Sequence, residues 1–302
     1  MAQVLKYRPH SRLDAIQALL EVHSHRRARS VLDGGYASVF RGRGTDFEDL
    51  REYVPGDAVA DIDWKATARA GRPLVRRYRA ERKNNLLLIV STGRSMTAVA
   101  PDGTIKHELA MAVAGVFAQL AVRHRDLVGA VFGDSERQVA GRTRAGRDHA
   151  ELVLSSLAAA AADERGAVSS LPAVLDYAVK ARLPRGIAVL VMDDADLGPN
   201  GRRSLTLLHA RHEVMVVRIA DMQMAAANAI APFDVETGLE LPDEVRLSTS
   251  VWAEAEGLAA RQSREIERAL GSRGIAHGRV TGQDDLVETL IGVLERHRAG
   301  GR

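Results

Sequence analysis

The sequence of 302 residues contains no cysteine, and only 4 % of its residues are aromatic. Without thiols the chain can form neither disulfides nor thiolate-ligated zinc and iron–sulfur sites, and a reducing compartment is permitted. Because aromatic residues are scarce, the hydrophobic core must consist mainly of aliphatic side chains. The length is sufficient for one large domain or two modest ones with a sizeable core.

Charge of one sign does not dominate the sequence. The formal net charge is +3 and the isoelectric point is near 9.4, with acidic and basic residues nearly in balance. Proteins dedicated to nucleic-acid binding usually concentrate Lys and Arg on one face, so this mild basicity gives little support for that role. We therefore expect no specific nucleic-acid partner.

Long hydrophobic runs are also missing. The longest nearly apolar stretch, residues 109–122, contains Gln119 and is shorter than the ~20 residues that a membrane-spanning helix needs. It is typical of a helix in the core of a domain. Because the N-terminus lacks the apolar core of a signal peptide, we expect a cytoplasmic protein with no membrane insertion.

The sequence lacks complete catalytic motifs. No Gly-x-x-x-x-Gly-Lys-Ser/Thr stretch is present, which excludes ATP hydrolysis by P-loop chemistry. The segment from Gly133 to Arg137 approaches a Gly-x-Ser-x-Gly nucleophile elbow, but it lacks the last glycine and precedes an apparent strand. A hairpin turn is expected there instead. The histidines show no metal-ligand spacing, and we expect that the protein is not an enzyme.

The most informative stretch is Asn85-Leu86-Leu87-Leu88-Ile89-Val90-Ser91-Thr92-Gly93-Arg94-Ser95-Met96. Its apolar run has no polar alternation, which indicates a strand buried on both faces of a mainly parallel sheet. The hydroxyl-bearing and glycine residues that follow indicate a loop at the carboxyl edge of that sheet. Ligands of open α/β folds bind at this edge, so the loop is the first candidate functional site.

Strands and helices alternate along the rest of the chain, which predicts an α/β fold with a mainly parallel sheet and helices on both faces. We expect this domain to occupy residues 85–300, after an N-terminal part at residues 1–84. The expected strands are residues 86–90, 127–132, 138–139, 187–192, 214–219 and 275–280, and residues 245–253 look extended. The expected helices are residues 106–123, 148–162, 171–181, 203–212, 258–271 and 284–297.

The N-terminal part begins with helical apolar spacing at residues 11–25. The basic cluster that follows, with Arg26, Arg27 and Arg29, either caps this helix at a solvated end or forms a docking patch for an acidic partner. Asp33-Gly34-Gly35 is expected to interrupt the structure.

Residues 45–78 predict a small β-containing subdomain with a type II turn at Val54-Pro55-Gly56-Asp57 and a helical piece at residues 64–68. Opposite charges are dense here, and we expect them to form an ion-pair network that fixes geometry more than it adds stability. The charged residues are Asp46, Glu48, Asp49, Arg51, Glu52, Asp57, Asp61, Asp63, Lys65, Arg69 and Arg72.

Two resemblances to known families are carried by these segments. The strings at residues 42–57 and 61–75, from Gly42-Arg43-Gly44-Thr45-Asp46 to Arg72-Pro73-Leu74-Val75, resemble the signature of the bacterial family named domain of unknown function fifty-eight. Members of that family often accompany MoxR-type AAA+ ATPases. The loop after residue 90 resembles the Asp-x-Ser-x-Ser motif of von Willebrand factor A (vWA) domains. Together they imply a vWA-like adaptor or assembly factor with a MoxR-type ATPase as partner.

The vWA motif is a metal-ion-dependent adhesion site that holds Mg²⁺, and the resemblance implies where its ligands would lie. Ser95 matches the motif, whereas Ser91 stands where the Asp is expected and Gly93 where the first Ser is expected. Asp194, in the Asp193-Asp194-Ala195-Asp196 loop, is the implied acidic ligand, and Thr143 is a further candidate. Mg²⁺ favours carboxylate oxygens, so we expect a degenerate site that binds no metal.

Two rival functions remain open at this point. Asp61, Asp63 and Lys65 would share one face of a strand and could hold a metal for phosphodiester cleavage, although the segment looks more helical than extended. A nonspecific nucleic-acid binder is the second rival. It would use Arg76, Arg77, Arg79, Arg82 and Lys83.

Overall fold

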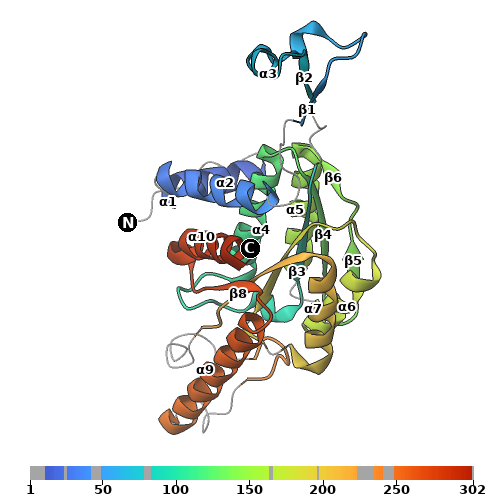
Figure 1. Cartoon of the computed structure of the whole chain (residues 1–302). Coiled ribbons are helices and arrows are strands. Elements are labelled where there is room, and N and C mark those ends of the chain that lie inside the picture. The colour runs from blue at the N-terminus through green and yellow to red at the C-terminus, as the bar shows by residue number, and fades with distance from the viewer. Residues whose placement is uncertain are drawn as a thin grey trace. The chain divides into compact units, whose positions relative to one another are not determined.

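The computed structural model describes residues 11–23, 26–41, 49–77, 83–162, 166–195, 197–222, 234–240 and 248–300. The chain divides into two compact units (Figure 1). Phe40–Lys83 form the smaller unit, and the larger one combines Met1–Val39 with Asn84–Arg302. The expected change of domain near residue 84 therefore coincides with a unit boundary, but the first helices belong to the larger unit.

A mainly parallel sheet forms the centre of the larger unit. Its strands are β3 (Asn85–Ser91), β4 (Leu127–Gly133), β5 (Gln138–Ala140), β6 (Arg144–Ala145), β7 (Ile187–Asp193), β8 (Glu213–Ile219) and β9 (Ala276–Val280). The order across the sheet is β5-β4-β3-β7-β8-β9, and β6 also pairs with β4. Only β5 and β6 run antiparallel to their described neighbour. The predicted α/β class is confirmed.

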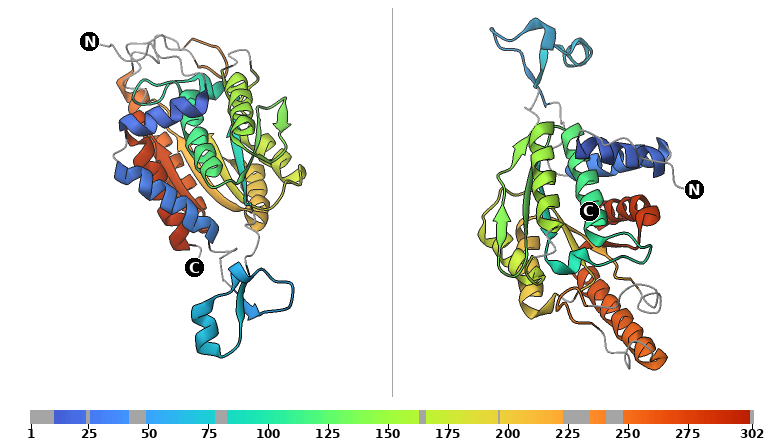
Figure 2. Two further views of the ribbon diagram at one scale, coloured as in Figure 1. Left: turned by 90° about the horizontal axis from the view of Figure 1, so that it is seen from above. Right: turned by 180° about the vertical axis from the view of Figure 1, so that it is seen from behind.

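Helices cover both faces of this sheet, which is why its central strands are apolar throughout (Figure 2). Helices α1 (Arg12–His23), α4 (Lys106–Arg123), α5 (Arg147–Ala161) and α10 (Gln283–Gly300) pack on one face. Helices α6 (Leu171–Lys180), α7 (Gly198–Arg211) and the end of α9 (Thr249–Gly271) bury Leu87, Ile89 and Leu190 on the other. None of the described helices is long and apolar enough to cross a membrane.

The N-terminal segment corrects one sequence prediction. Helix α2 (Arg26–Arg41) runs straight through Asp33-Gly34-Gly35, where an interruption was expected. A Cβ atom on Gly35 would lie 3.3 Å from the Cβ atom of Leu294 in α10, so the glycine lets the two helices approach closely. The next residue, Tyr36, is fully buried and donates a hydrogen bond to Asp126 (3.2 Å). Tertiary packing outweighs the low helix propensity of glycine here.

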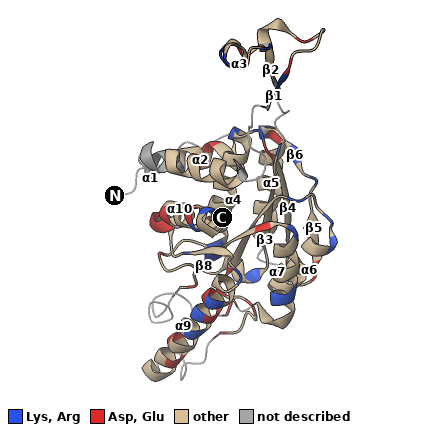
Figure 3. Ribbon diagram, in the orientation of Figure 1, with Lys and Arg blue, Asp and Glu red and all other residues tan. Residues whose placement is uncertain are grey.

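Helix α9 is longer than the sequence predicts. Residues 249–253 were expected to be extended, but they form its first turns, and residues 245–247 lie outside the described part of the chain. The Ser248 hydroxyl accepts a hydrogen bond from the backbone N–H of Val251 and so caps the helix. The amino-terminal half of α9 extends away from the sheet, and its charged residues, Glu254 and Glu256, are acidic, whereas the arginines of α9 lie in its carboxyl-terminal half (Figure 3).

The smaller unit is a two-stranded antiparallel sheet with short helical pieces. It contains β1 (Asp49–Glu52), η1 (Val59–Asp61), α3 (Trp64–Ala70) and β2 (Leu74–Arg77). The predicted turn is present: Asp57 N donates to Val54 O (3.0 Å) and Gly56 has a φ of 111°. Part of the expected ion-pair network forms as well, with Arg51 paired to Asp57 (2.6 Å) and Arg72 to Glu52.

Candidate functional site

The loop after β3 is tightly built at the carboxyl edge of the sheet. Ser91 lies opposite Gly133 in the register of β3 and β4, and Thr92 N donates to Gly133 O (2.9 Å). Both Ser91 and Thr92 are buried. The chain then passes Gly93 and forms a short 3₁₀ turn, η2 (Arg94–Thr97). Its residue Ser95 is also buried, so the loop has a fixed shape in which few side chains reach solvent.

Ser95 meets two residues that are far away in the sequence, Ser169 and Glu236. The backbone N–H of Ser95 donates to Glu236 Oε1 (3.0 Å) and to Ser169 Oγ (2.9 Å). The backbone N–H of Ser169, just before α6, contacts both carboxylate oxygens of Glu236 at 3.2 and 3.1 Å. The hydroxyls of Ser95 and Ser169 lie 2.6 Å apart. We call the two N–H groups and two hydroxyls of Ser95 and Ser169 the carboxylate cradle.

Gly93 is required for this arrangement. A Cβ atom at Gly93 would lie 2.4 Å from Ser169 Cα and 2.8 Å from Ser169 N, which are backbone atoms that cannot move aside without shifting the loop. Arg94 N donates to Ala167 O (3.1 Å) and holds the two loops together. The motif position where vWA domains carry a serine therefore contains glycine because the second loop occupies the space.

A compact turn presents Glu236 to the cradle. Asp234 Oδ1 accepts from the backbone N–H of Glu236 (2.9 Å), and Asp234 Oδ2 accepts from the Thr237 hydroxyl (2.8 Å). These hydrogen bonds, first the one from the Glu236 backbone, lower the pKa of Asp234. Gly238 closes the turn with a φ of 70° and a hydrogen bond to Asp234 O. The carboxylate of Glu236 is thus oriented before it meets Ser95.

Asp194, the acidic ligand implied by the resemblance, has other partners. Its Oδ1 atom lies 2.9 Å from Nη1 of Arg218, and its Oδ2 atom lies 2.5 Å from Nε of Arg279. The Arg218 side chain is fully buried and also contacts Glu267 (2.6 Å) and Ser263 Oγ (2.9 Å). This ion-pair cluster joins the end of β7 to β8, β9 and α9. A metal ion at Asp194 would have to displace two guanidinium groups.

Thr143 does not lie near the loop. Its methyl group packs over Gly129, where an added Cβ atom would be 2.7 Å away. Gly129 lies four residues before Gly133, or ~13 Å along the strand at ~3.3 Å per residue. The antiparallel strands β5 and β6 return the chain along β4 toward its amino end, which explains the displacement.

The proposed metal ligands are therefore not assembled. Ser95 contacts Ser169 and Glu236, Asp194 contacts two arginines, and Thr143 lies at the amino half of β4. The donor set does not fit Mg²⁺, which favours several carboxylate or water oxygens around one point. The residues that do meet at the loop favour an anion, because they present N–H groups.

A buried cation also lies at this edge of the sheet. Lys106, at the start of α4, is 1 % exposed, and its ammonium group pairs with Asp221 and lies 3.9 Å from Asp193 Oδ2. The side chain of Asp221 is 54 % exposed, so this carboxylate reaches the lysine from the surface. From the sequence, Lys106 was expected only as the first residue of a helix.

The residues of the two rival functions lie in the smaller unit or outside the described part. Asp63 caps α3 by accepting from the backbone N–H groups of Lys65 and Ala66 (3.0 Å each), so Asp63 and Lys65 do not share one face of a strand. The side chains of Asp61, Arg76 and Arg77 are not described, nor are Arg79 and Arg82, and Lys83 is exposed. Arg26, Arg27 and Arg29 form the first turn of α2, but the structure does not describe their side chains.

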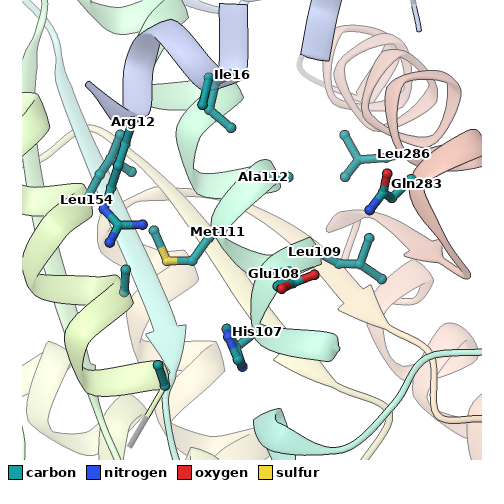
Figure 4. A pocket seen from close by; sticks show the side chains of 13 residues that line it. Arg12, Ile16, His107, Glu108, Leu109, Met111, Ala112, Leu154, Gln283 and Leu286 are labelled. Carbon is teal, nitrogen blue, oxygen red and sulfur yellow. The ribbon is translucent and has the colours of Figure 1, made fainter. Parts of the chain in front are cut away.

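A separate pocket of about 420 Å³ lies between α1, α4, α5 and α10 (Figure 4). Apolar side chains such as Ile16, Met111, Leu154 and Leu286 line most of it, and Arg12, His107 and Glu108 add polar groups. None of its lining residues belongs to the carboxylate cradle. No residue predicted from the sequence as a site residue lines it.

Solved structures similar to this chain include vWA-type domains at low sequence identity. One is a von Willebrand factor type A protein from Catenulispora acidiphila: 11 % identity, TM-score 0.41, covering 73 % of this chain but only 43 % of that one. Another is an aerotolerance-related membrane protein from Bacteroides fragilis: 13 % identity, TM-score 0.41, covering 70 % of this chain and 98 % of that one.

Sequence comparison gives a closer relationship. An uncharacterized protein of Mycobacterium tuberculosis (strain H37Rv) is 29 % identical over 235 residues, which cover 76 % of this chain and 72 % of the relative. The family model described as "Protein of unknown function DUF58" matches residues 49–242, which include the smaller unit's sheet, the loop after β3, the carboxylate cradle and Glu236. Because this match covers more than half of the sequence, the chain belongs to the DUF58 family.

Proposed function

We propose that this protein is a non-enzymatic, vWA-like adaptor or assembly factor of the cytoplasm, which recognises partner proteins and works with a MoxR-type AAA+ ATPase. The carboxylate cradle carries the proposal. It lies at the carboxyl edge of the sheet, where α/β folds bind ligands, and it holds a carboxylate through backbone N–H groups. A site of this kind can bind an acidic side chain without a metal.

The chemistry around the cradle supports binding rather than catalysis. A serine nucleophile needs a base that accepts its hydroxyl proton. Glu236 accepts from the backbone N–H groups of Ser95 and Ser169, while the two hydroxyls contact each other. Among the described residues no histidine or lysine contacts either hydroxyl. The cradle thus has the donors to hold an anion and lacks an activated nucleophile.

The proposed partner is the one that the resemblance to this family implies, and the chain belongs to the family. The docking surface for the ATPase would include the first turn of α2, where Arg26, Arg27 and Arg29 follow one another closely. Three positive charges there suit an acidic surface and would speed the encounter of the two proteins.

The test is association with the MoxR-type ATPase of the same organism, measured by light scattering after size exclusion, with and without ATP. We expect the full chain to form a complex, and the triple change Arg26→Gln, Arg27→Gln and Arg29→Gln to weaken it at least tenfold. The matched control replaces three exposed arginines of α9 and α10: Arg261→Gln, Arg264→Gln and Arg298→Gln. Absence of a complex in every nucleotide state would refute the adaptor proposal, as would substrate turnover by the isolated chain.

A further inference from the structure

The turn at residues 234–240 is attached to the larger unit in an unusual way. Among the described residues, its hydrogen bonds to the rest of the unit come from the carboxylate of Glu236. The other hydrogen bonds described for it are internal: Asp234 accepts from Glu236, Thr237 and Gly238 and donates to Leu239 O, and Leu239 N donates to Thr237 Oγ1. Leu239 is 69 % exposed, and Val235 is half-buried. Within the described part of the chain, the side chain of Glu236 supplies the hydrogen bonds that hold the turn to the sheet edge.

We infer that Glu236 is a built-in, displaceable occupant of the carboxylate cradle, and that it competes with an acidic side chain of a partner protein. This inference rests on the proposed function, because it assumes that the cradle is a recognition site. In the structure, the carboxylate of Glu236 occupies the site. A partner binds when its own carboxylate takes the place of Glu236 on the N–H groups of Ser95 and Ser169.

The contacts of Glu236 are those of a ligand rather than of a buried ion pair. No cationic side chain among the described residues pairs with its carboxylate, which is held by neutral N–H donors alone. The Glu236 side chain is only partly buried, and water can solvate it when it leaves. Release therefore strands no charge inside the protein, unlike the removal of one partner from a buried ion pair.

The same loop holds an unused donor. The Nε atom of Arg94, the residue before Ser95, is buried and has no hydrogen-bond partner in the described part of the chain. A buried N–H group without a partner is uncommon in folded proteins, and this one belongs to the residue next to Ser95. An incoming carboxylate could add an ion pair with Arg94, which Glu236 does not make. This additional ion pair would let the carboxylate of a partner compete with Glu236, which is tethered to the same chain as the cradle.

Tethering determines how strongly Glu236 competes. A group on the same chain has an effective concentration of roughly millimolar or more at its site. The apparent dissociation constant of an external carboxylate is then raised by the inverse of the fraction of molecules with an empty cradle. Removing the Glu236 carboxylate should therefore tighten binding of any small carboxylate, and the protein needs no partner for this effect to be measured.

The experiment uses the full chain labelled with ¹⁵N and the backbone amide signals of Ser95 and Ser169, with sodium acetate as the probe. In the unmodified protein we expect these signals to respond little to acetate. In Glu236→Ala they should move upfield, because the hydrogen bonds are lost, and acetate should restore them saturably with at least tenfold tighter apparent binding. Sodium chloride at equal ionic strength controls for salt. Glu240→Ala, an exposed acid of the same turn, controls for the loss of a charge.

Two results would overturn the inference. Unchanged Ser95 and Ser169 signals in Glu236→Ala would mean that Glu236 does not occupy the cradle in solution. Shifted signals that acetate cannot restore would mean that Glu236 is a fixed structural contact and that the cradle is no binding site for other carboxylates. The same titration of Glu236→Gln keeps the size of the side chain and should also reveal acetate binding. Because no ATPase is present, these outcomes are independent of whether the MoxR-type partner is correct.

Discussion

Replacement of Asp194 by asparagine tests whether this residue is a structural ion-pair partner or a metal ligand. Asp194→Asn keeps the size of the side chain and removes its charge. Among the described residues, Arg218, whose side chain is 0 % exposed, would then keep Glu267 as its anionic partner, and the Glu267 side chain is 45 % exposed. Breaking a buried ion pair on one side costs ~3–5 kcal/mol. Because Glu267 remains, we expect the lower end of this range, about 3 kcal/mol of unfolding free energy.

The assay is thermal unfolding followed by circular dichroism, in EDTA and in millimolar Mg²⁺. A loss of ~3 kcal/mol corresponds to a fall in Tm of roughly 6–12 °C for a domain of this size, and Mg²⁺ should not alter it. The control is Asp176→Asn, which removes an exposed pair with Lys180 (2.6 Å) and should change the stability by less than ~0.5 kcal/mol. An unchanged Tm for Asp194→Asn would refute the reasoning. So would a stabilisation of the unmodified protein by Mg²⁺ that this variant lacks.

Three further predictions follow from individual residues. Burial, reinforced by nearby arginines, lowers the pKa of His212, so the unfolded chain binds the proton more readily than the folded one. The contribution of His212 to stability should be complete above the unfolded pKa of ~6.5 and fall as the pH drops through it. Thermal melts at different pH values should show this dependence, and His212→Gln should flatten it. Gly93→Ser should lower the Tm, and the double change with Ser91→Asp should create no Mg²⁺ site by calorimetry, because a Cβ atom at Gly93 meets the Ser169 backbone at 2.4 Å; saturable Mg²⁺ uptake by the double variant would contradict this. In urea, the smaller unit should unfold before the larger one, because Val75 is its one residue that is buried among those described. The fluorescence of Trp64 (65 % exposed), measured in Trp252→Phe, should therefore change at lower urea than that of Trp252 (7 % exposed), measured in Trp64→Phe. Coincident transitions would show that the two units unfold together.

The central sheet was predictable because its strands are buried on both faces. A run such as residues 86–90 can be interpreted without distant contacts, because five consecutive apolar residues that end in a hydroxyl- and glycine-containing loop are typical of a short strand covered on both faces. The same holds for α4, whose nearly continuous apolar sequence predicted a core helix and whose middle turns are buried. These elements have local signals that agree with their tertiary surroundings.

The failures occur where packing overrides a local signal. Gly34 and Gly35 are poor helix residues, yet α2 passes through them because Gly35 faces Leu294. Thr143 was placed near the loop by resemblance, but the antiparallel return of β5 and β6 takes it to the other half of β4. Both elements are determined by contacts between residues more than ten positions apart, and the order of residues alone does not reveal such contacts.

Glu236 was missed for the same reason. It lies 141 positions after Ser95, and a single acidic residue carries no spacing signal. The sequence Asp234-Val235-Glu236-Thr237-Gly238 does indicate a turn stabilised by its aspartate, because Asp side chains accept from backbone N–H groups two residues on. That signal could have located the turn. It could not have shown that the turn delivers its carboxylate to the loop after β3.

The absence of a carboxylate at position 91 and the binding of Glu236 to the loop are linked by electrostatics. An aspartate at Ser91 would place a fixed negative charge at the buried end of β3, in the loop to which Glu236 is bound. Two carboxylates in such a setting repel each other unless a cation lies between them. With neutral Ser91, close-packed Gly93 and the N–H groups of Ser95 and Ser169, the same edge of the sheet accepts an anion directly. Because a neutral Ser91 leaves the loop without a carboxylate of its own, we expect the ligand that replaces Glu236 to be an acidic side chain rather than a metal ion.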